Sequence, residues 1–194
     1  MEHAAADIAK LEARIVACRQ ATEARPDDAK AWFDLGLALQ SAERYADAVE
    51  AYDRALDLAP NVAAVVFNRG LAQRKLARHE SAATDFRRAL ALAPRLAEAH
   101  YNLGNALVDL GRRAEAVAAF RSAVAIRPDY VEAWHNLGDS LQATHDLESA
   151  LDAYGRALAL DPAGFPRIVN SLAAHAKGRL WLDFEALRRD LSRR

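Results

Sequence analysis

The chain has little of what many small folds depend on: its 194 residues contain one cysteine, six prolines and eight glycines, and only 7% are aromatic. A single cysteine, Cys18, excludes an intramolecular disulfide framework and is typical of a reducing compartment. So few glycines and prolines disfavour an all-β fold with its many turns. Hydrophobic residues reach 52%, but alanine supplies much of that share, and alanine favours helix.

Neither charge sign is in excess, because 26 basic residues face 27 acidic ones and the formal net charge is −1. Non-specific nucleic-acid binding needs a basic excess, so no nucleic-acid partner is expected. No apolar run approaches the roughly 18 residues that a membrane-spanning helix needs. The first residues, Met-Glu-His-Ala, do not resemble a secretory signal. We therefore expect a soluble, cytoplasmic protein without membrane insertion.

Sequence motifs for catalysis are also missing. The chain has no glycine-rich phosphate loop, no HExxH, no paired CxxC and no Gly-x-Ser-x-Gly elbow. Ser140 lies in a Gly-Asp-Ser-Leu tetrapeptide, but that match is short and falls in a predicted helix. His135 and Asp139 stand four residues apart, and two ligands alone make a poor metal site. The sequence predicts a protein that is not an enzyme and has no cofactor or metal.

A repeat of 34 residues organises the chain into four full units, 29–62, 63–96, 97–130 and 131–164. Small residues at fixed positions predict close helix crossings, faced by an aromatic residue, and the proline marks where one unit ends. Breaks at 42–45, 77–80, 111–114 and 144–147 divide each unit into two helices. The invariant columns are position eight (Gly36, Gly70, Gly104, Gly138), position twenty (Ala48, Ala82, Ala116, Ala150) and position thirty-two (Pro60, Pro94, Pro128, Pro162), with position twenty-four aromatic (Tyr52, Phe86, Phe120, Tyr154).

The flanks read in the same register. Residues 1–28 are expected to form an N-terminal capping segment with a helix over 3–24. Residues 165–194 are expected to form a divergent fifth repeat that acts as a cap, with helices over 166–177 and 183–192. The second unit departs from the pattern at two positions. Arg69 stands at position seven, where the other units have leucine, and Gln73 stands at position eleven. The whole chain, 1–194, is then one repeat domain.

These columns closely resemble the tetratricopeptide repeat, a helix–turn–helix unit of 34 residues. The resemblance implies an all-α fold, a right-handed α-solenoid of antiparallel helix pairs, whose first helices line a concave groove. It implies that position six faces that groove, where the chain has an asparagine ladder similar to that in the repeat domain of O-linked N-acetylglucosamine transferases. There the amides grip the backbone of an extended peptide. The ladder is Asp34, Asn68, Asn102, Asn136 and Asn170.

The resemblance also assigns other side chains to the groove. Position five carries rings that either form an apolar strip beside the ladder or pack between neighbouring first helices: Phe33, Phe67, Tyr101 and His135. Charges on the same face are basic in the first two units and acidic in the next two, which predicts a ligand with a basic segment over units three and four. These residues are Lys30, Arg74, Lys75, Glu98, Asp109, Glu132 and Asp139.

A second groove chemistry of this family is a clamp for the C-terminal carboxylate of a chaperone. Asn105 and Asn136 match its two amides. Its cations are missing, because Tyr101 stands at one cation position and Pro166 and Asn170 at the others. Binding of a chaperone tail is therefore not expected.

The sequence predicts a non-catalytic interaction module that binds an extended peptide of a partner protein in its groove. Two alternatives stay open: a self-associating, homo-oligomeric scaffold, and a subunit that delivers substrate to a separate enzyme. The partner's identity does not follow from the sequence.

Overall fold

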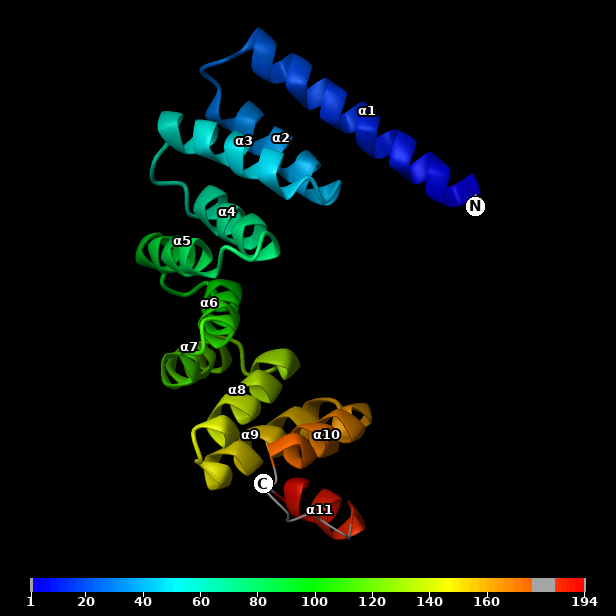
Figure 1. The fold of residues 1–194 in the computed structure, drawn as a ribbon, viewed down its shortest axis with the longest axis vertical. Helices are drawn as coiled ribbons and strands as arrows, with labels where there is room; N and C mark the ends of the chain where they lie inside the picture. Colours follow the sequence, from blue (N-terminus) through cyan, green and yellow to red (C-terminus); the bar gives the residue numbers. More distant parts are fainter. Residues whose placement is uncertain (1, 176–183, 194) are drawn as a thin grey trace. The chain divides into compact units, whose positions relative to one another are not determined.

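The computed structural model describes residues 2–175 and 184–193, and this part of the chain is helical and contains no strand. The predicted all-α class, an array of paired antiparallel helices, is confirmed (Figure 1). The chain divides into two compact units, Met1–Pro94 and Arg95–Arg194, and each is described by itself.

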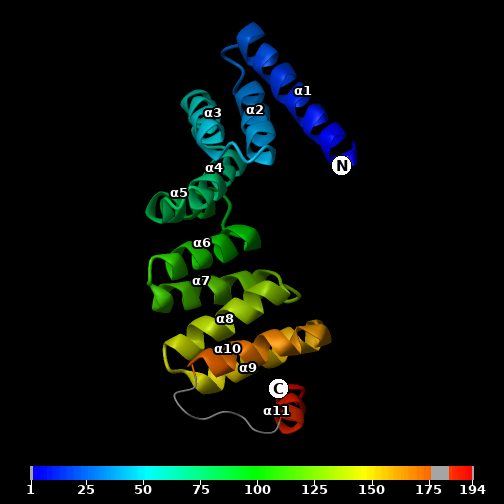
Figure 2. The same ribbon diagram turned by 45° about the vertical axis from the view of Figure 1, so that its right-hand side comes forward.

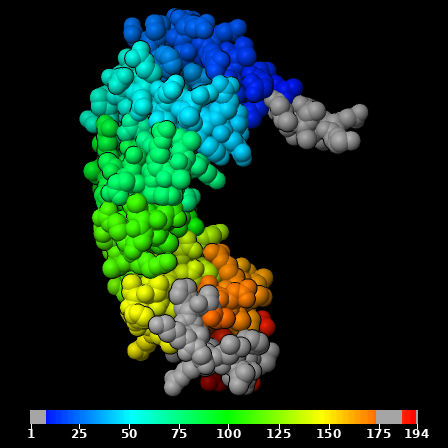
Figure 3. Space-filling model, in the orientation of Figure 1, coloured from blue at the N-terminus to red at the C-terminus, as the bar shows by residue number. Residues whose placement is uncertain are grey.

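The first unit holds two helix pairs and a long leading helix. The leading helix α1, Glu2–Ala24, lies along α2, and Ile15 is its fully buried contact, whereas most of residues 9–24 are exposed (Figure 3). The helix predicted over 3–24 is therefore present. The pairs are α2 (Ala29–Ser41) with α3 (Tyr45–Leu58), and α4 (Ala63–Lys75) with α5 (His79–Leu92).

The described residues of the second unit form two more pairs and two terminal helices (Figure 2). At its end α10 packs on α8 and α11 on α9, burying Ile168, Leu172, Leu187 and Leu191. These helices correspond to those predicted over 166–177 and 183–192, of which 176–183 lie outside the described residues. The elements are α6 (Ala97–Asp109), α7 (Arg113–Ile126), α8 (Val131–Ala143), α9 (Leu147–Leu160), the short 3-10 helix η1 (Pro162–Gly164), α10 (Phe165–His175) and α11 (Phe184–Leu191).

The glycine column exists because an aromatic ring lies against it. A Cβ built on Gly104 would stand 2.5 Å from Cε1 of Phe120, and Phe120 is fully buried. In the other three repeats, a Cβ built on the glycine of position eight would likewise stand 2.4 to 2.8 Å from the nearest atom of the aromatic ring at position twenty-four. The first helix of each pair can thus approach the second closely, which sets the direction of the side chains on its other face.

A left-handed residue ends the first helix of every pair, always at position fifteen. The residues are Glu43, Ala77, Gly111 and His145, with φ of 56°, 57°, 74° and 67°. The following amide then bonds back to the carbonyl five residues earlier, as from Arg78 to Gln73 at 2.9 Å, which satisfies the helix end. The predicted breaks fall on these turns, so each first helix presents the same face within its unit.

Candidate functional site

The ladder residues of the first unit are held by local contacts. Asp34 accepts a hydrogen bond from Lys30 Nζ at 2.6 Å, and this bond, with the charge of Asp34, raises the pKa of Lys30. Asn68 donates from Nδ2 to the carbonyl of Ala64 at 2.8 Å. Arg74 and Lys75 lie in the last turn of α4. The predicted basic character of this unit's face is therefore reduced at Lys30.

Asn102 in the second unit repeats the arrangement of Asn68. Its Nδ2 lies 2.8 Å from the carbonyl of Glu98, four residues back. This bond uses one of the two amide hydrogens and fixes the rotamer, so the second N–H and the Oδ1 acceptor keep a set direction. Asn68 and Asn102 are thus oriented before any ligand arrives.

The rings at position five pack inside their own unit. Each lies against the aromatic residue nineteen positions later, on the second helix of the pair, and the hydroxyl of Tyr101 also accepts a hydrogen bond from Asn136 on the neighbouring first helix. Tyr101 also lies 4.8 Å from Tyr130, measured between ring centroids. The first three rings are half-buried and His135 is buried, so they form part of the packing as well as one wall of the face. The centroid distances are 5.9 Å for Phe33–Tyr52, 5.8 Å for Phe67–Phe86, 5.9 Å for Tyr101–Phe120 and 5.6 Å for His135–Tyr154.

One predicted acid of the second unit, Glu98, is already paired. Its Oε1 accepts from Arg127 Nη1 at 2.5 Å, and the Arg127 guanidinium lies 3.5 Å from the ring centroid of Tyr130. Burial raises the pKa of Tyr130 to about 12, against the lowering effect of Arg127. Asp109 and Glu132 are exposed on the same unit. Arg127 of the same unit thus neutralises one of the acidic residues expected on this face.

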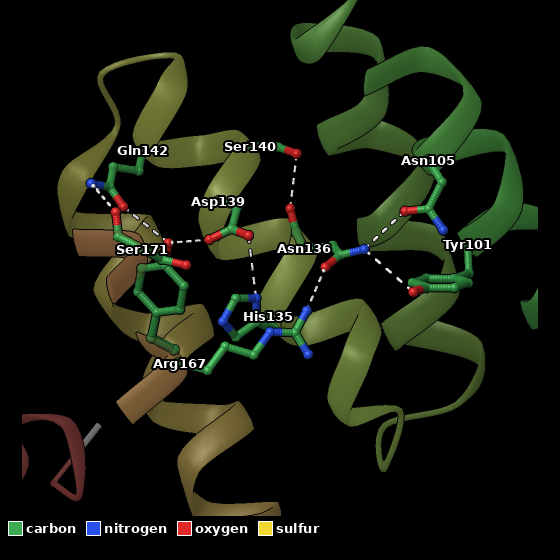
Figure 4. A network of polar contacts seen from close by, with 10 residues as sticks. Tyr101, Asn105, His135, Asn136, Asp139, Ser140, Gln142, Arg167 and Ser171 are labelled. Atoms are coloured by element: carbon green, nitrogen blue, oxygen red, sulfur yellow. Dashed lines mark hydrogen bonds and ion pairs between the residues drawn. The ribbon is translucent and has the colours of Figure 1, made fainter. Parts of the chain in front are cut away.

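A cleft of about 630 Å³ gathers several predicted residues of the second unit in one place (Figure 4). It lies where α6, the start of α7, α8 and α10 meet. Four predicted groove residues line it, together with five that the sequence did not single out for the groove. The lining residues are Asn105, Val108, Arg113, Asn136, Asp139, Ser140, Arg167, Asn170 and Ser171.

Asn136 is the centre of a hydrogen-bond network at this cleft (Figure 4). Its Nδ2 donates to Asn105 Oδ1 at 2.8 Å and to the Tyr101 hydroxyl at 3.4 Å. Its Oδ1 accepts from Arg167 Nη2 at 3.4 Å. Because a guanidinium only donates, the Asn136 atom that faces it must be the oxygen, which fixes the orientation of the amide. This rung therefore differs from Asn68 and Asn102, since its amide is engaged by other side chains.

Asp139 also lines the cleft and has a polar group of the protein near each oxygen. The Tyr154 hydroxyl donates to Oδ1 at 2.7 Å, and His135 Nδ1 lies 3.3 Å from Oδ2. The histidine contact is an ion-pair distance but is not aligned as a hydrogen bond, and neither ring nitrogen has a hydrogen-bond partner within the described residues. Burial raises the pKa of Asp139, but the contacts from His135 and Tyr154 outweigh it, so the net pKa lies below the usual 3.8.

Arg113 and Arg167 are the cleft residues that matter most among those the sequence did not identify. They stand at positions seventeen and three of their units, outside the groove positions that the family resemblance supplied. Arg113 opens α7, and Arg167 belongs to the divergent fifth unit, where the repeat columns weaken. The available signal was a positive charge in the first turn of α7 and of α10.

Two further findings concern the described residues alone. Within residues 2–175 and 184–193, no three His, Cys, Asp or Glu side chains gather in a way that could hold a metal ion. In the same ranges, no helix combines the length and the apolar character that crossing a bilayer requires.

Comparison with protein families gives matches over most of the repeat region. Models described as "TPR repeat" match residues 74–111 and 104–144, and models described as "Tetratricopeptide repeat" match 29–62 and 131–163. Residues 63–73, where Arg69 and Gln73 depart from the other units, lie between the matched ranges. No curated protein sequence matches the chain.

Solved structures share the fold at low sequence identity. A crystal structure of MamA is 21% identical, with a TM-score of 0.77 over 81% of this chain and 92% of that one. MamA from Desulfovibrio magneticus RS-1 is 22% identical, with a TM-score of 0.75 over 79% of this chain and 86% of that one. YrrB, described as "a TPR protein with an unusual peptide-binding site", is 23% identical, with a TM-score of 0.74 over 91% and 93%.

Proposed function

Because the chain belongs to the tetratricopeptide repeat family, we propose that it is a non-catalytic interaction protein whose second unit binds an extended segment of a partner polypeptide. Proteins of this family mediate contacts between proteins. The observation that supports the finer proposal is the cleft itself. It brings together Asn105, Asn136, Asp139 and Asn170, four residues that the repeat pattern assigns to the groove.

The chemistry of the cleft suits an extended chain. A peptide backbone has one donor and one acceptor per residue, and an amide side chain can pair with both. Asn102 lies on the same helix as Asn105, but its side chain is buried and bonded to Glu98, so the amides open to a chain are those that line the cleft. Each amide–backbone pair contributes about 0.5–1.5 kcal/mol net, so a few of them support micromolar affinity at best.

Among the structural relatives, YrrB is described as having a peptide-binding site. At 23% identity that likeness concerns the fold, and it makes a peptide ligand for this chain a reasonable expectation rather than a transferred property. The two alternatives, a self-associating scaffold and a subunit that delivers substrate to an enzyme, stay predictions.

Selection from a random library of twelve-residue peptides on the immobilised full chain tests the proposal. Selected peptides are labelled and titrated by fluorescence polarisation against the wild type and the Asn105→Ala/Asn170→Ala variant. We expect the variant to bind about tenfold more weakly, because two hydrogen bonds of about 0.7 kcal/mol each are lost. The matched control is Asn61→Ala, an exposed asparagine before α4, which should bind normally. Failure to select any peptide, or selected peptides that ignore the cleft variant, would contradict the proposal.

A further inference from the structure

We propose that two copies of this chain associate through their leading helices, with α1 of each copy lying antiparallel to α1 of the other, beside a hollow between α1 and α3. This dimer involves the first unit, whereas the proposed function belongs to the second unit, so neither depends on the other. Three features of the first unit lead to it: an open hollow, an exposed valine and an order of charges that complements itself.

The first feature is the hollow of about 720 Å³, which residues of α1, α2 and α3 line. Its floor is apolar, because the buried side chains of Leu35, Leu39 and Ala51 form it. In the second repeat, residues 63–96, Arg69 takes the place of Leu35, and its guanidinium bonds Asp53 of α3 across the corresponding space. Leu35 is shorter and has no charge, so the first repeat keeps an open apolar floor.

The second feature is Val16, which is 52% exposed, the highest value among the large hydrophobic side chains of the described residues. No described helix covers this side of α1 (Figure 1 and Figure 2). Val16 stands three residues before Arg19, through which α1 lines the hollow, so the valine and the hollow are neighbours. In a two-fold dimer, each copy can therefore place its valine in the hollow of the other.

The third feature is the order of charges on the same side of α1. Glu12, Val16, Arg19 and Glu23 follow one another at intervals of four, three and four residues, which places them in one stripe of the helix. All four are exposed, and neither Glu12 nor Arg19 has an ion-pair partner within the described residues. These two residues stand about one turn to either side of Val16. Two helices that meet antiparallel at Val16 therefore bring Glu12 of each copy to Arg19 of the other.

The charge order also selects the direction of the second copy. A parallel pair would place Glu12 beside Glu12 and Arg19 beside Arg19, so like charges would repel, whereas the antiparallel pair forms two ion pairs related by the two-fold axis. A contact made of one helix and one hollow is smaller than a standard interface of about 800 Å² per partner. We therefore expect a dissociation constant of about 10 µM.

Sedimentation equilibrium of the full-length chain between about 1 and 200 µM tests the proposal, and we expect the wild type to show a monomer–dimer equilibrium. Arg19→Glu and Glu12→Arg should each weaken dimerisation at least tenfold, because each places two like-charged pairs across the interface. Val16→Asp should do the same, since it brings a charge to the apolar floor. All three side chains are exposed, so circular dichroism and thermal unfolding should match the wild type.

Mixing the two charge variants separates the proposed pairing from a general loss of association. Arg19→Glu has acids at both positions and Glu12→Arg has arginines at both, so a mixed dimer regains two pairs of opposite charge. We expect the mixture to form dimers with about the wild-type affinity although neither variant does so alone. Arg14→Glu is the matched control, because Arg14 is exposed on α1 but lies outside the stripe and the hollow. It should leave dimerisation unchanged.

A wild type that stays monomeric up to about 200 µM would overturn the inference. A dimer that both Arg19→Glu and Val16→Asp leave intact would also overturn it, because the contact between copies would then lie elsewhere on the chain. If the two charge variants do not associate when mixed, Glu12 and Arg19 do not meet, and the antiparallel arrangement is wrong. The peptide titrations of the second unit are independent of these results, so failure of one proposal is distinguishable from failure of the other.

Discussion

Arg69 and Asp85 form a bidentate ion pair, with Nε and Nη2 of the arginine 2.9 and 2.6 Å from the two carboxylate oxygens. The pair joins α4 to α5 and is nearly removed from solvent, because the side chains are 19% and 4% exposed. A third member, the half-exposed Asp53 on α3, accepts from Arg69 Nη1 at 2.5 Å.

This pair explains the departure of the second 34-residue repeat, residues 63–96, from the other three repeats. Position seven is a buried leucine and position twenty-three a buried alanine in those units, and both change together here to a pair of opposite charges. A charge among apolar side chains is costly unless it is paired, so neither residue suits this place without the other. The counterparts are Leu35, Leu103 and Leu137, and Ala51, Ala119 and Ala153.

Replacing Asp85 with alanine should lower the free energy of unfolding by about 3 kcal/mol, because it leaves Arg69 buried with only the exposed Asp53 as a partner. The Arg69→Leu/Asp85→Ala variant, which restores the residues of the other units, should fall within about 1 kcal/mol of the wild type. Urea denaturation measures both. Asp53→Ala is the control and should cost less than about 1 kcal/mol, because Asp53 is 49% exposed. A double variant that is less stable than Asp85→Ala would contradict this account.

The glycines at position eight lead to a second prediction. Gly104→Ala should destabilise the protein by about 2 kcal/mol, because its Cβ would overlap the buried ring of Phe120, and overpacking outweighs the roughly 1 kcal/mol that alanine gains in a helix. Thermal unfolding followed by circular dichroism measures the change. The Gly104→Ala/Phe120→Leu variant, in which the ring is removed, should be more stable than the sum of the two single changes implies. An increase in melting temperature for Gly104→Ala alone would mean that helix propensity dominates.

The turns at position fifteen lead to a third prediction. Ala77 holds a left-handed φ of 57° that costs an L-residue about 1–2 kcal/mol, and glycine avoids this cost. Glycine loses more backbone entropy on folding, so Ala77→Gly should gain about 0.5–1 kcal/mol net in urea denaturation. The reverse change, Gly111→Ala, should lose a similar amount, because a Cβ there meets no neighbour and only the backbone is affected. Changes of the opposite sign would show that the turn conformation is not the deciding factor.

The helices were predictable because repetition multiplies weak signals. A single glycine in a helix says little, but four in register, each sixteen residues before an aromatic residue, indicate a close crossing. The left-handed turn at position fifteen was harder to predict. Only Gly111 carries the usual residue for that conformation, whereas Glu43, Ala77 and His145 adopt it because the helix end must bond its last carbonyls.

The candidate site was only partly predictable, for a different reason. The column of amides follows from the repeat, but what each amide bonds depends on neighbours that do not repeat. Asn68 turns back to its own helix, whereas Asn136 meets Asn105 and Arg167, and Arg167 belongs to the most divergent unit. The partnership of Arg69 and Asp85 did leave a trace, since two columns break sixteen residues apart with opposite charges.

Asp139 provides the last prediction, on pH. Burial works to raise its pKa, but the contacts with His135 and Tyr154 prevail and hold it below 3.8 in the folded protein. A carboxyl group whose pKa is lower in the folded than in the unfolded state stabilises the fold above the unfolded pKa, and this contribution is lost as the pH falls through the folded pKa. The titration of this carboxyl should therefore leave the difference in unfolding free energy between the wild type and Asp139→Asn constant above about pH 4.5. Below about pH 4 the difference should shrink, because the carboxyl becomes protonated.

A carbon-detected NMR titration isolates this carboxyl from the other acids, because its signal is the one missing in Asp139→Asn. We expect a midpoint below 3.8 in the wild type. Tyr154→Phe removes the donor at 2.7 Å while keeping the ring that faces Gly138, so it should raise the midpoint without disturbing the packing. The control is Tyr52→Phe in the first unit, whose hydroxyl bonds Gln40 and should leave the Asp139 midpoint unchanged. A wild-type midpoint at or above 3.8 would mean that burial outweighs the two contacts, and Asp139 would then lose its charge in mild acid and weaken the cleft network before the fold is lost.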